Sequence, residues 1–513
     1  MLQKQRCLSS YAEPYKHCSA EGRLGTTMKR RDFLRIGGCC AITAALLDIP
    51  AIAGKKDQRP NIIFLMADDL GYGDTGFNGN KIIRTPHLDA MAKDGIRFTR
   101  FYSIGPVCTP TRASCLTGRH YMRFGMMRAN IGKLPKQEIT LAKACKAKGY
   151  ATGHFGKWHL GSMSKSESPR HKDPAADYAP PWERDYDDAF ATEISCPTWN
   201  PASGNFKRHN VPYWHNGKKV TENLTGDDSR VIMDRAIPFI QKALAGSKPF
   251  MATIWFHAPH SPVVAGPEYL KMYKGHTEGQ QHYYGCITAM DEQIGRLRDE
   301  LKRLGIEKNT ILWFCSDNGP EGTGKPKRVY DAYGGAFCGQ TGGLRGRKRS
   351  LYNGGVCVPA IAVWPGTVAK GRTVNMPCST LDYLPTVCEA IGFDYPDERP
   401  IDGESLLPML LGKMNQRKTS IPFASIIEKP YTAMIKGHFK LCTNLSASGT
   451  EDALYHLRDD PAETNNLISA HRQLAQSMKT ELFEWIKSCR KSFDGKDYRE
   501  PYEPQGRFLI YGK

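Results

Sequence analysis

Three runs of consecutive apolar residues, 61–67, 250–256 and 310–315, are each about the length of one strand. They lack the alternation of a half-buried strand, so we expect each strand to be covered on both faces, as in an α/β sheet. Between the last two runs, apolar residues recur at helical spacing with charged residues among them, at Tyr284, Ile287, Met290, Ile294, Leu297, Leu301 and Leu304. This pattern predicts a long amphipathic helix that covers the sheet.

Shorter patterns predict the elements between these runs. Residues 85–95 are expected to form a helix with Leu88, Met91 and Ala92 facing inward, followed by a strand over 97–102. Residues 162–226 have little periodicity and are predicted to be long loops at a substrate mouth. Near the C-terminus, residues 421–444 are predicted to form short strands beside a final helix over 471–488.

The length and charge of the chain set its broad class. With 513 residues, the chain is predicted to form a main domain over 54–410 and a smaller C-terminal domain over 411–513. The formal charge of +19 favours an anionic partner. The basic residues are dispersed except at 345–349, and no nucleic-acid-binding motif is present, so we expect no nucleic acid partner.

Residues 1–53 have the features of a leader. Arg30 and Arg31 precede a modest apolar segment over 36–47, and small residues follow at 51–53. This arrangement predicts a twin-arginine export signal that engages the twin-arginine export machinery, with Met28 as a possible true start. The mature protein is therefore expected in the periplasm or outside the cell.

Polar residues directly follow two of the apolar runs. Asp68 and Asp69 follow the first, and Asp317 and Asn318 follow the third. In an open α/β sheet, ligands collect beyond the carboxyl ends of the strands. Adjacent buried carboxylates are costly unless a cation compensates them, so a hard metal ion is predicted, although a helix N-cap pair remains an alternative for Asp68 and Asp69.

A possible nucleophile lies at the start of a predicted helix, in the pattern C-x-P-x-R-x-x-x-L-T-G over 108–118. Pro110 suits the first turn of a helix, and Cys108 would lie near the positive helix end. Arg112 would lie on the same face at the i, i+4 spacing. Ordinary packing of a buried cysteine is the alternative. Sixteen cysteines occur without paired C-x-x-C motifs, and their number does not establish a disulfide framework.

Further motifs follow in order along the chain. Residues 149–161 match G-Y-x-T-x-x-x-G-K-W-H-x-G and contain Lys157 and His159, H-A-P-H begins at His257, and L-R-G-x-K ends at Lys348. With the Cys108 pattern, these motifs resemble those of the sulfatase family over roughly residues 59–490. Two departures are visible: Asn353 stands where the family usually has glutamate, and Cys357 where it usually has arginine.

The resemblance implies an alkaline-phosphatase-like α/β fold, a mixed sheet sandwiched by helices, with a small C-terminal α+β domain. It implies that a formylglycine-generating enzyme converts Cys108 to formylglycine, whose hydrate attacks the sulfur of a sulfate ester. It also implies one bound Ca²⁺, with the ligand set Asp68, Asp69, Cys108, Asp317 and Asn318.

The resemblance also implies roles for the basic residues. Arg112 and Lys157 would hold the hydrate and the sulfate, and His159 would be the base that releases the intermediate. His257 and Lys348 would stabilise the leaving oxygen. The expected function is hydrolysis of a sulfate ester, with a carbohydrate sulfate preferred as substrate. A phosphoester or phosphonate hydrolase of the same superfamily and a non-catalytic binder of sulfated glycans are the alternatives.

Overall fold

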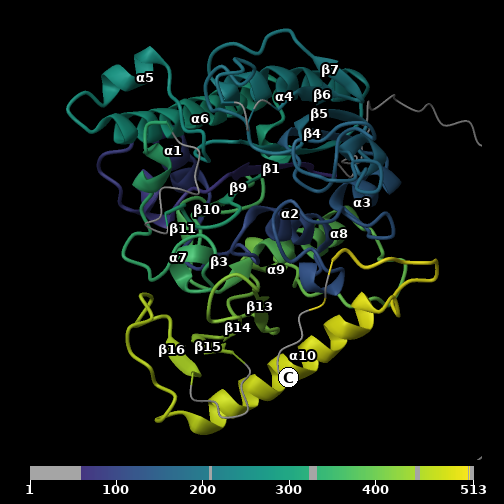
Figure 1. Ribbon diagram of the computed structural model, residues 1–513, viewed down its shortest axis with the longest axis vertical. Helices are drawn as coiled ribbons and strands as arrows, with labels where there is room; N and C mark the ends of the chain where they lie inside the picture. Colours follow the sequence, from purple (N-terminus) through teal and green to yellow (C-terminus); the bar gives the residue numbers. More distant parts are fainter. Residues whose placement is uncertain are drawn as a thin grey trace, which may run out of the picture. The chain divides into compact units, whose positions relative to one another are not determined.

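The three long apolar runs form neighbouring parallel strands in the computed structural model (Figure 1). Strand β1 (Asn61–Ala67) lies between β8 (Phe250–Trp255) and β9 (Thr310–Ser316), and all three are buried along their whole length. The structure describes residues 59–206, 209, 211–322, 332–444, 451–506 and 508. Because all three strands are buried along their whole length, the prediction that both of their faces are covered is confirmed.

In this described part of the chain, ten strands form one mixed sheet. Their spatial order is β11 (Arg372–Val374), β2 (Ile96–Phe98), β10 (Ala360–Val363), β9, β1, β8, β4 (Ala151–Lys157), β5 (Asp188–Thr192), β6 (Tyr213–His215) and β7 (Lys218–Val220). The steps from β9 to β10, from β10 to β2 and from β5 through β6 to β7 are antiparallel. The prediction that 162–226 contains only loops is wrong, because β5, β6 and β7 extend the sheet. These strands have three to five residues, too few to show a periodicity.

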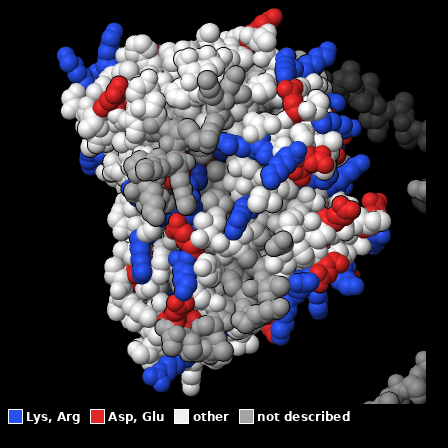
Figure 2. All heavy atoms as spheres, in the orientation of Figure 1, with Lys and Arg blue, Asp and Glu red and all other residues white. Residues whose placement is uncertain are grey.

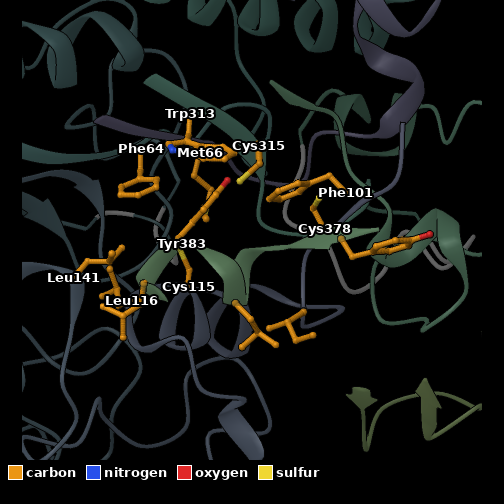
Figure 3. Packing of buried hydrophobic residues seen from close by; sticks show 14 of the residues in the cluster. Phe64, Met66, Phe101, Cys115, Leu116, Leu141, Trp313, Cys315, Cys378 and Tyr383 are labelled. Carbon is orange, nitrogen blue, oxygen red and sulfur yellow. The ribbon is translucent and has the colours of Figure 1, made fainter. Parts of the chain in front are cut away.

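Helices cover both faces of the sheet (Figure 1). On one face lie α1 (Pro86–Asp94), α4 (Asp228–Ala245) and α6 (Glu278–Arg303), and on the other lie α2 (Cys108–Thr117), α3 (Leu141–Ala147) and α8 (Tyr383–Ile391). Ile63 and Leu65 of β1 pack in the first core, whereas Phe64 and Met66 pack in the second. Figure 3 shows Phe64 and Met66 near Trp313 and Tyr383 in the second core. Two apolar faces explain why β1 has no polar alternation.

The predicted strand over 97–102 is divided in the structure. The chain leaves the large sheet after β2, and β3 (Phe101–Tyr102) pairs instead with β12 (Cys378–Ser379). The helix expected at 85–95 is confirmed as α1, with Leu88, Met91 and Ala92 buried. Three short helices complete the description, α5 (Pro267–Met272), α7 (Asn353–Val356) and α9 (Leu407–Leu410).

A separate antiparallel sheet follows in the C-terminal region, in the order β13 (Ile421–Ala424), β14 (Thr432–Lys436), β15 (Phe439–Thr443) and β16 (Ala453–His456). The final helix, α10 (Arg472–Phe493), packs on it through Met478 and Leu482. The expected α+β arrangement is confirmed, and α10 runs farther than predicted. The domain boundary near residue 410 stays a prediction, since residues 57–513 form one unit.

The expected leader over 1–53 lies outside the described residues. Within the described part of the chain, we find no helix that combines the length and apolar character needed to cross a membrane. Figure 2 shows Lys and Arg side chains spread over the visible face, with Asp and Glu side chains among them.

Candidate functional site

The polar residues that follow β1 and β9 meet at one edge of the sheet. Ala67 and Ser316 are opposite each other in these parallel strands, so the residues after them lie side by side. The backbone N–H of Asp69 donates to Oδ1 of Asp317 at 3.2 Å, and Nδ2 of Asn318 donates to Oδ1 of Asp69 at 2.6 Å. The predicted convergence of these strand ends is confirmed.

Helix α2 brings the cysteine to the same place. Cys108 is its first residue, and its Sγ lies 3.4 Å from Oδ1 of Asp68. Arg112, one turn later, donates to Oδ2 of Asp317 from Nε at 3.1 Å and from Nη2 at 2.8 Å. Both side chains are therefore buried against the carboxylates of the strand ends.

Two lysines from distant parts of the sequence contact these carboxylates. Lys157 ends β4, and its Nζ lies 2.5 Å from Oδ2 of Asp68. Gly156 before it has a φ of +104°, and a Cβ there would lie 2.0 Å from the backbone oxygen of Trp255, so only glycine fits. Nζ of Lys348 lies 2.6 Å from Oδ1 of Asp69. Each ammonium group thus compensates one buried carboxylate.

A cavity of about 570 Å³ opens above these groups, and Cys108, His159, Ser195, His260 and Lys348 are among the residues that line it. Nε2 of His159 lies 2.8 Å from Oδ1 of Asn130. Among the described residues, Nδ1 of His159 has no hydrogen-bond partner. Lys157 and His159 therefore both reach the site, while Trp158 between them packs in the core.

The structure places His257 apart from the cavity. It is fully buried, with Nδ1 2.7 Å from Oδ2 of Asp228 and Nε2 2.7 Å from Oγ1 of Thr192. His260 of the same motif lines the cavity instead, with Nε2 3.7 Å from Oδ2 of Asp69. The predicted contact of His257 with the leaving oxygen therefore stays a prediction, and the geometry favours His260 for that contact.

Several acidic groups at the site have strongly shifted pKa values. Burial opposes ionisation of Asp68, yet Lys157, His260 and Arg112 hold the pKa of its carboxyl well below the usual range. Burial raises the pKa of Asp69 to about 7, with further contributions from Asp68 and Glu321 and with Lys348 acting in the opposite direction. Burial and the neighbouring carboxylates raise the pKa of the Cys108 thiol well above its usual range. This outweighs the thiolate-favouring position at the helix start.

The oxygen atoms at the strand ends suit a hard metal ion. Oδ1 of Asn318 is buried and has no hydrogen-bond partner among the described residues, although its Nδ2 donates twice. One ligand atom from each of Asp68, Asp69, Cys108 and His260 also lies within 4.8 Å of the others. Several carboxylate oxygens and an unpaired amide oxygen form a donor set typical of Ca²⁺ sites.

Some residues of the site carry no strong signal in the sequence. Ser195, whose Oγ lies 3.3 Å from Oδ2 of Asp68, follows β5 in the stretch expected to be loops. Glu321 pairs with Arg349 through both carboxylate oxygens, and Asn130 contacts His159. Only His260 belonged to a motif, H-A-P-H, that could have identified it.

Comparisons with known proteins agree with this geometry. A family model described as Sulfatase matches residues 60–393, and one described as N-sulphoglucosamine sulphohydrolase, C-terminal, matches residues 346–490. The chain is 32% identical over 405 residues to N-acetylgalactosamine-6-sulfatase of Mus musculus, covering 74% of this chain and 73% of that protein. It is 32% identical over 444 residues to arylsulfatase A of Homo sapiens, covering 80% and 84%.

Solved structures show the same architecture. The crystal structure of Ps i-CgsB in complex with k-i-k-neocarrahexaose superimposes with a TM-score of 0.72 at 26% identity, covering 87% of this chain and 95% of that one. The phosphonate monoester hydrolase of Agrobacterium radiobacter shares the fold, with a TM-score of 0.58 at 19% identity, covering 85% and 96%. The family match over residues 60–393, the relatives and the assembled site lead to one conclusion: the chain belongs to the sulfatase family, with its alkaline-phosphatase-like fold, and is a hydrolase of sulfate esters.

Proposed function

We propose that the protein removes sulfate from a carbohydrate, using formylglycine at position 108 and one Ca²⁺ at Asp68, Asp69, Asp317 and Asn318. The observation that carries the proposal is the meeting of Cys108, the strand-end oxygens and three cationic side chains at one cavity. A sulfate ester needs its electron-rich oxygens neutralised and an activated oxygen presented to the sulfur. This collection of groups meets both needs.

The state of Cys108 supports the conversion. A thiol whose pKa lies well above the usual range is almost fully protonated at neutral pH, and a protonated thiol is a poor nucleophile. The hydrate of formylglycine would instead supply two hydroxyl groups on one carbon. When bound, Ca²⁺ would act as a Lewis acid toward oxygen atoms at the site.

The basic side chains have separate tasks in this proposal. Lys157 and Lys348 each carry three N–H donors, so each can bind a sulfate oxygen as well as its carboxylate partner. Arg112 fixes the carboxylate of Asp317 with two hydrogen bonds. His260, rather than His257, lines the cavity and would contact the leaving oxygen.

His159 suits the role of the base. Burial and the nearby Lys157 and Arg112 lower the pKa of its imidazole well below the usual range, so the ring is neutral. With Oδ1 of Asn130 as acceptor, Nε2 carries the proton and Nδ1 keeps its lone pair. Nδ1 of His159 can therefore take a proton from a hydroxyl group on residue 108.

The proposed substrate class rests on the cavity and on the comparisons. The cavity is large enough for a sugar and lined by polar and charged groups. One relative is named an N-acetylgalactosamine-6-sulfatase, and one structural neighbour is described in complex with k-i-k-neocarrahexaose. Both names concern carbohydrates, which supports a sulfated sugar as the substrate of this chain.

The decisive experiment uses protein made with a formylglycine-generating enzyme, a proposed partner in maturation. We expect peptide mass spectrometry to find formylglycine at position 108, and defined sulfated sugars to release sulfate. Asp317→Ala should reduce activity and bound Ca²⁺ together, whereas the exposed Asp494→Ala should change neither. A Cys108 peptide found wholly as thiol in active protein would refute the proposed nucleophile, and unchanged Ca²⁺ content in Asp317→Ala would refute the metal site.

Two other functions are tested by the same protein. Faster hydrolysis of matched phosphate or phosphonate esters would favour a phosphoester or phosphonate hydrolase. Tight binding of a sulfated glycan without any turnover would favour a non-catalytic binder.

We also propose that the protein is exported through the twin-arginine machinery, on the basis of Arg30 and Arg31 before the apolar segment. Replacement of both arginines by lysine should retain the protein in the cytoplasm. Unchanged export of that variant would contradict this route.

A further inference from the structure

The cations at the floor of the cavity are already matched by carboxylates. The four ion pairs are Arg112 with Asp317, Lys157 with Asp68, Lys348 with Asp69 and Arg349 with Glu321. These pairs are buried or partly buried, where an unmatched charge would be costly. The floor therefore has no surplus of positive charge from these residues.

Two more arginines, Arg128 and Arg170, line the same cavity. Both are exposed. In the part of the chain that the structure describes, neither guanidinium group forms an ion pair with a carboxylate. The wall of the cavity thus carries two positive charges that no carboxylate among the described residues pairs with.

The backbone beneath Arg128 is held in place. Two residues along, Asn130 contacts Nε2 of His159, and its backbone N–H lies 3.4 Å from Oγ1 of Thr109. Gln505 holds the same loop at both ends, because its N–H donates to the oxygen of Phe124 and its Oε1 accepts from the N–H of Lys133. Arg128 therefore extends from a fixed loop.

The backbone beneath Arg170 is held in a similar way. Oγ of Ser168 accepts the N–H groups of Arg170 and His171 at 3.0 and 2.7 Å, and it donates to Oε1 of Glu193. Nδ1 of His171 lies 2.8 Å from Oδ2 of Asp177. The chain thus fixes the base of each arginine, and the charged end of each has no acidic partner among the residues that the structure describes.

We infer that Arg128 and Arg170 form a subsite for a second anionic group of the substrate, a carboxylate or another sulfate on the same glycan. This inference rests on the proposed function, since it deepens the substrate class of that site. A guanidinium group presents parallel N–H donors that match the oxygen pairs of carboxylate and sulfate groups. The hydrolysed sulfate occupies the floor, and the second anion binds these two arginines on the wall.

The test compares two substrates that carry the same scissile sulfate ester. One is a monosulfated sugar, and the other is a disaccharide that also carries a uronic acid carboxylate or a second sulfate. In the double variant Arg128→Gln with Arg170→Gln, we expect the ratio of kcat/KM for the dianionic over the monoanionic substrate to fall about tenfold, mostly through KM. Arg472→Gln is the matched control, since it removes an exposed charge that does not line the cavity, and it should leave the ratio unchanged.

Ionic strength separates the subsite from general attraction by the net charge. The whole-protein field should weaken equally in the wild type and in the Arg472→Gln control when salt is added. The wild-type preference for the dianionic substrate should be less sensitive to salt than this general attraction, because the hydrogen bonds of the subsite form at short range. An equal ratio in the wild type and the double variant would overturn the subsite while leaving sulfatase activity intact.

Failure of the proposed function gives a different result. If the wild type hydrolyses no sulfate ester, equilibrium binding of the same two sugars is measured by calorimetry. Weaker binding of the dianionic sugar by the double variant would support the subsite even then, and identical binding would overturn it.

Discussion

The carboxylate of Asp402 offers a quantitative test of how α10 is joined to the catalytic region. Arg123 donates to it from Nε at 2.7 Å and from Nη2 at 2.6 Å. The backbone N–H of His120 and Nε1 of Trp485 on α10 donate to the same carboxylate at 2.7 and 2.8 Å. The Arg123 and Asp402 side chains are each only 3% exposed.

Replacing Asp402 by alanine should lower the free energy of unfolding by about 3–5 kcal/mol, because Arg123 would keep a buried charge without its partner. This is a large part of a typical stability of about 5–15 kcal/mol. Removing the charge as well, in Asp402→Ala with Arg123→Met, should recover part of the loss. The double variant is therefore expected to be more stable than the single variant.

Urea unfolding at neutral pH, followed by tryptophan fluorescence, measures the effect through the midpoint. Asp494→Ala is the control, because its pair with Arg490 is half exposed and should contribute no more than about 1 kcal/mol. An Asp402→Ala midpoint close to that of the control would refute the assignment, as would a double variant less stable than Asp402→Ala.

The pH dependence of this contribution has a definite sign. Burial opposes ionisation of Asp402, yet Arg123 holds the pKa of its carboxyl well below the usual range. A depressed folded pKa stabilises the protein above the unfolded value of about 4 and loses that effect as the pH falls below it. The difference between wild type and Asp402→Ala should therefore be constant from pH 5 upward and shrink only in stronger acid.

Three further outcomes are expected. Burial raises the pKa of Asp74 to about 7. The contribution of this carboxyl to the free energy of unfolding should therefore fall by up to about 1.4 kcal/mol per pH unit as the pH rises from about 4 to 7. Asp74→Asn should flatten that part of the curve of stability against pH. Cys108→Ser cannot form the hydrate, so it should complete at most one slow turnover and retain sulfate on residue 108. The retained sulfate is measured as added mass of the intact protein. Sustained turnover by this variant would contradict the hydrate mechanism. Gln505→Ala loses the hydrogen bond from the Lys133 N–H and should lower kcat/KM severalfold, because the loop that carries Asn130 is held less firmly. Gln505→Glu should restore kcat/KM, since a carboxylate also accepts a hydrogen bond from that N–H.

Much of the central sheet could be predicted because its burial is visible in the sequence. β1 and β9 are apolar on both faces, and the acids after them had to lie together once the strands were adjacent and parallel. The strands β6 and β7 could not be predicted, because each has three residues and no apolar pattern. The division of the 97–102 run into β2 and β3 could not be predicted either, since β3 pairs with β12, which lies far along the chain.

The choice between two histidines shows the same limit at the site. His257 and His260 both follow β8 within one motif, and the resemblance implied that His257 contacts the leaving oxygen. Asp228, at the start of α4, lies 2.7 Å from Nδ1 of His257 and holds that ring in the interior. A contact between residues 29 positions apart therefore decides which histidine lines the cavity.

The Asp402 cluster and the catalytic cavity both contain matched charges, and they differ in where polar atoms are left unpaired. In the Asp402 cluster, Nε2 of His120 is a buried atom without a partner in the described chain, whereas no side-chain nitrogen or oxygen of Arg123, Asp402 or Trp485 is. At the cavity, Oδ1 of Asn318 and Nδ1 of His159 are both buried without one. An unpaired buried acceptor lowers stability, and a ligand that enters the adjoining cavity can complete one that lies there. At the cavity, the unpaired atoms lie where Ca²⁺ and a hydroxyl group of residue 108 are proposed to bind, whereas the matched charges around Asp402 hold α10 in place.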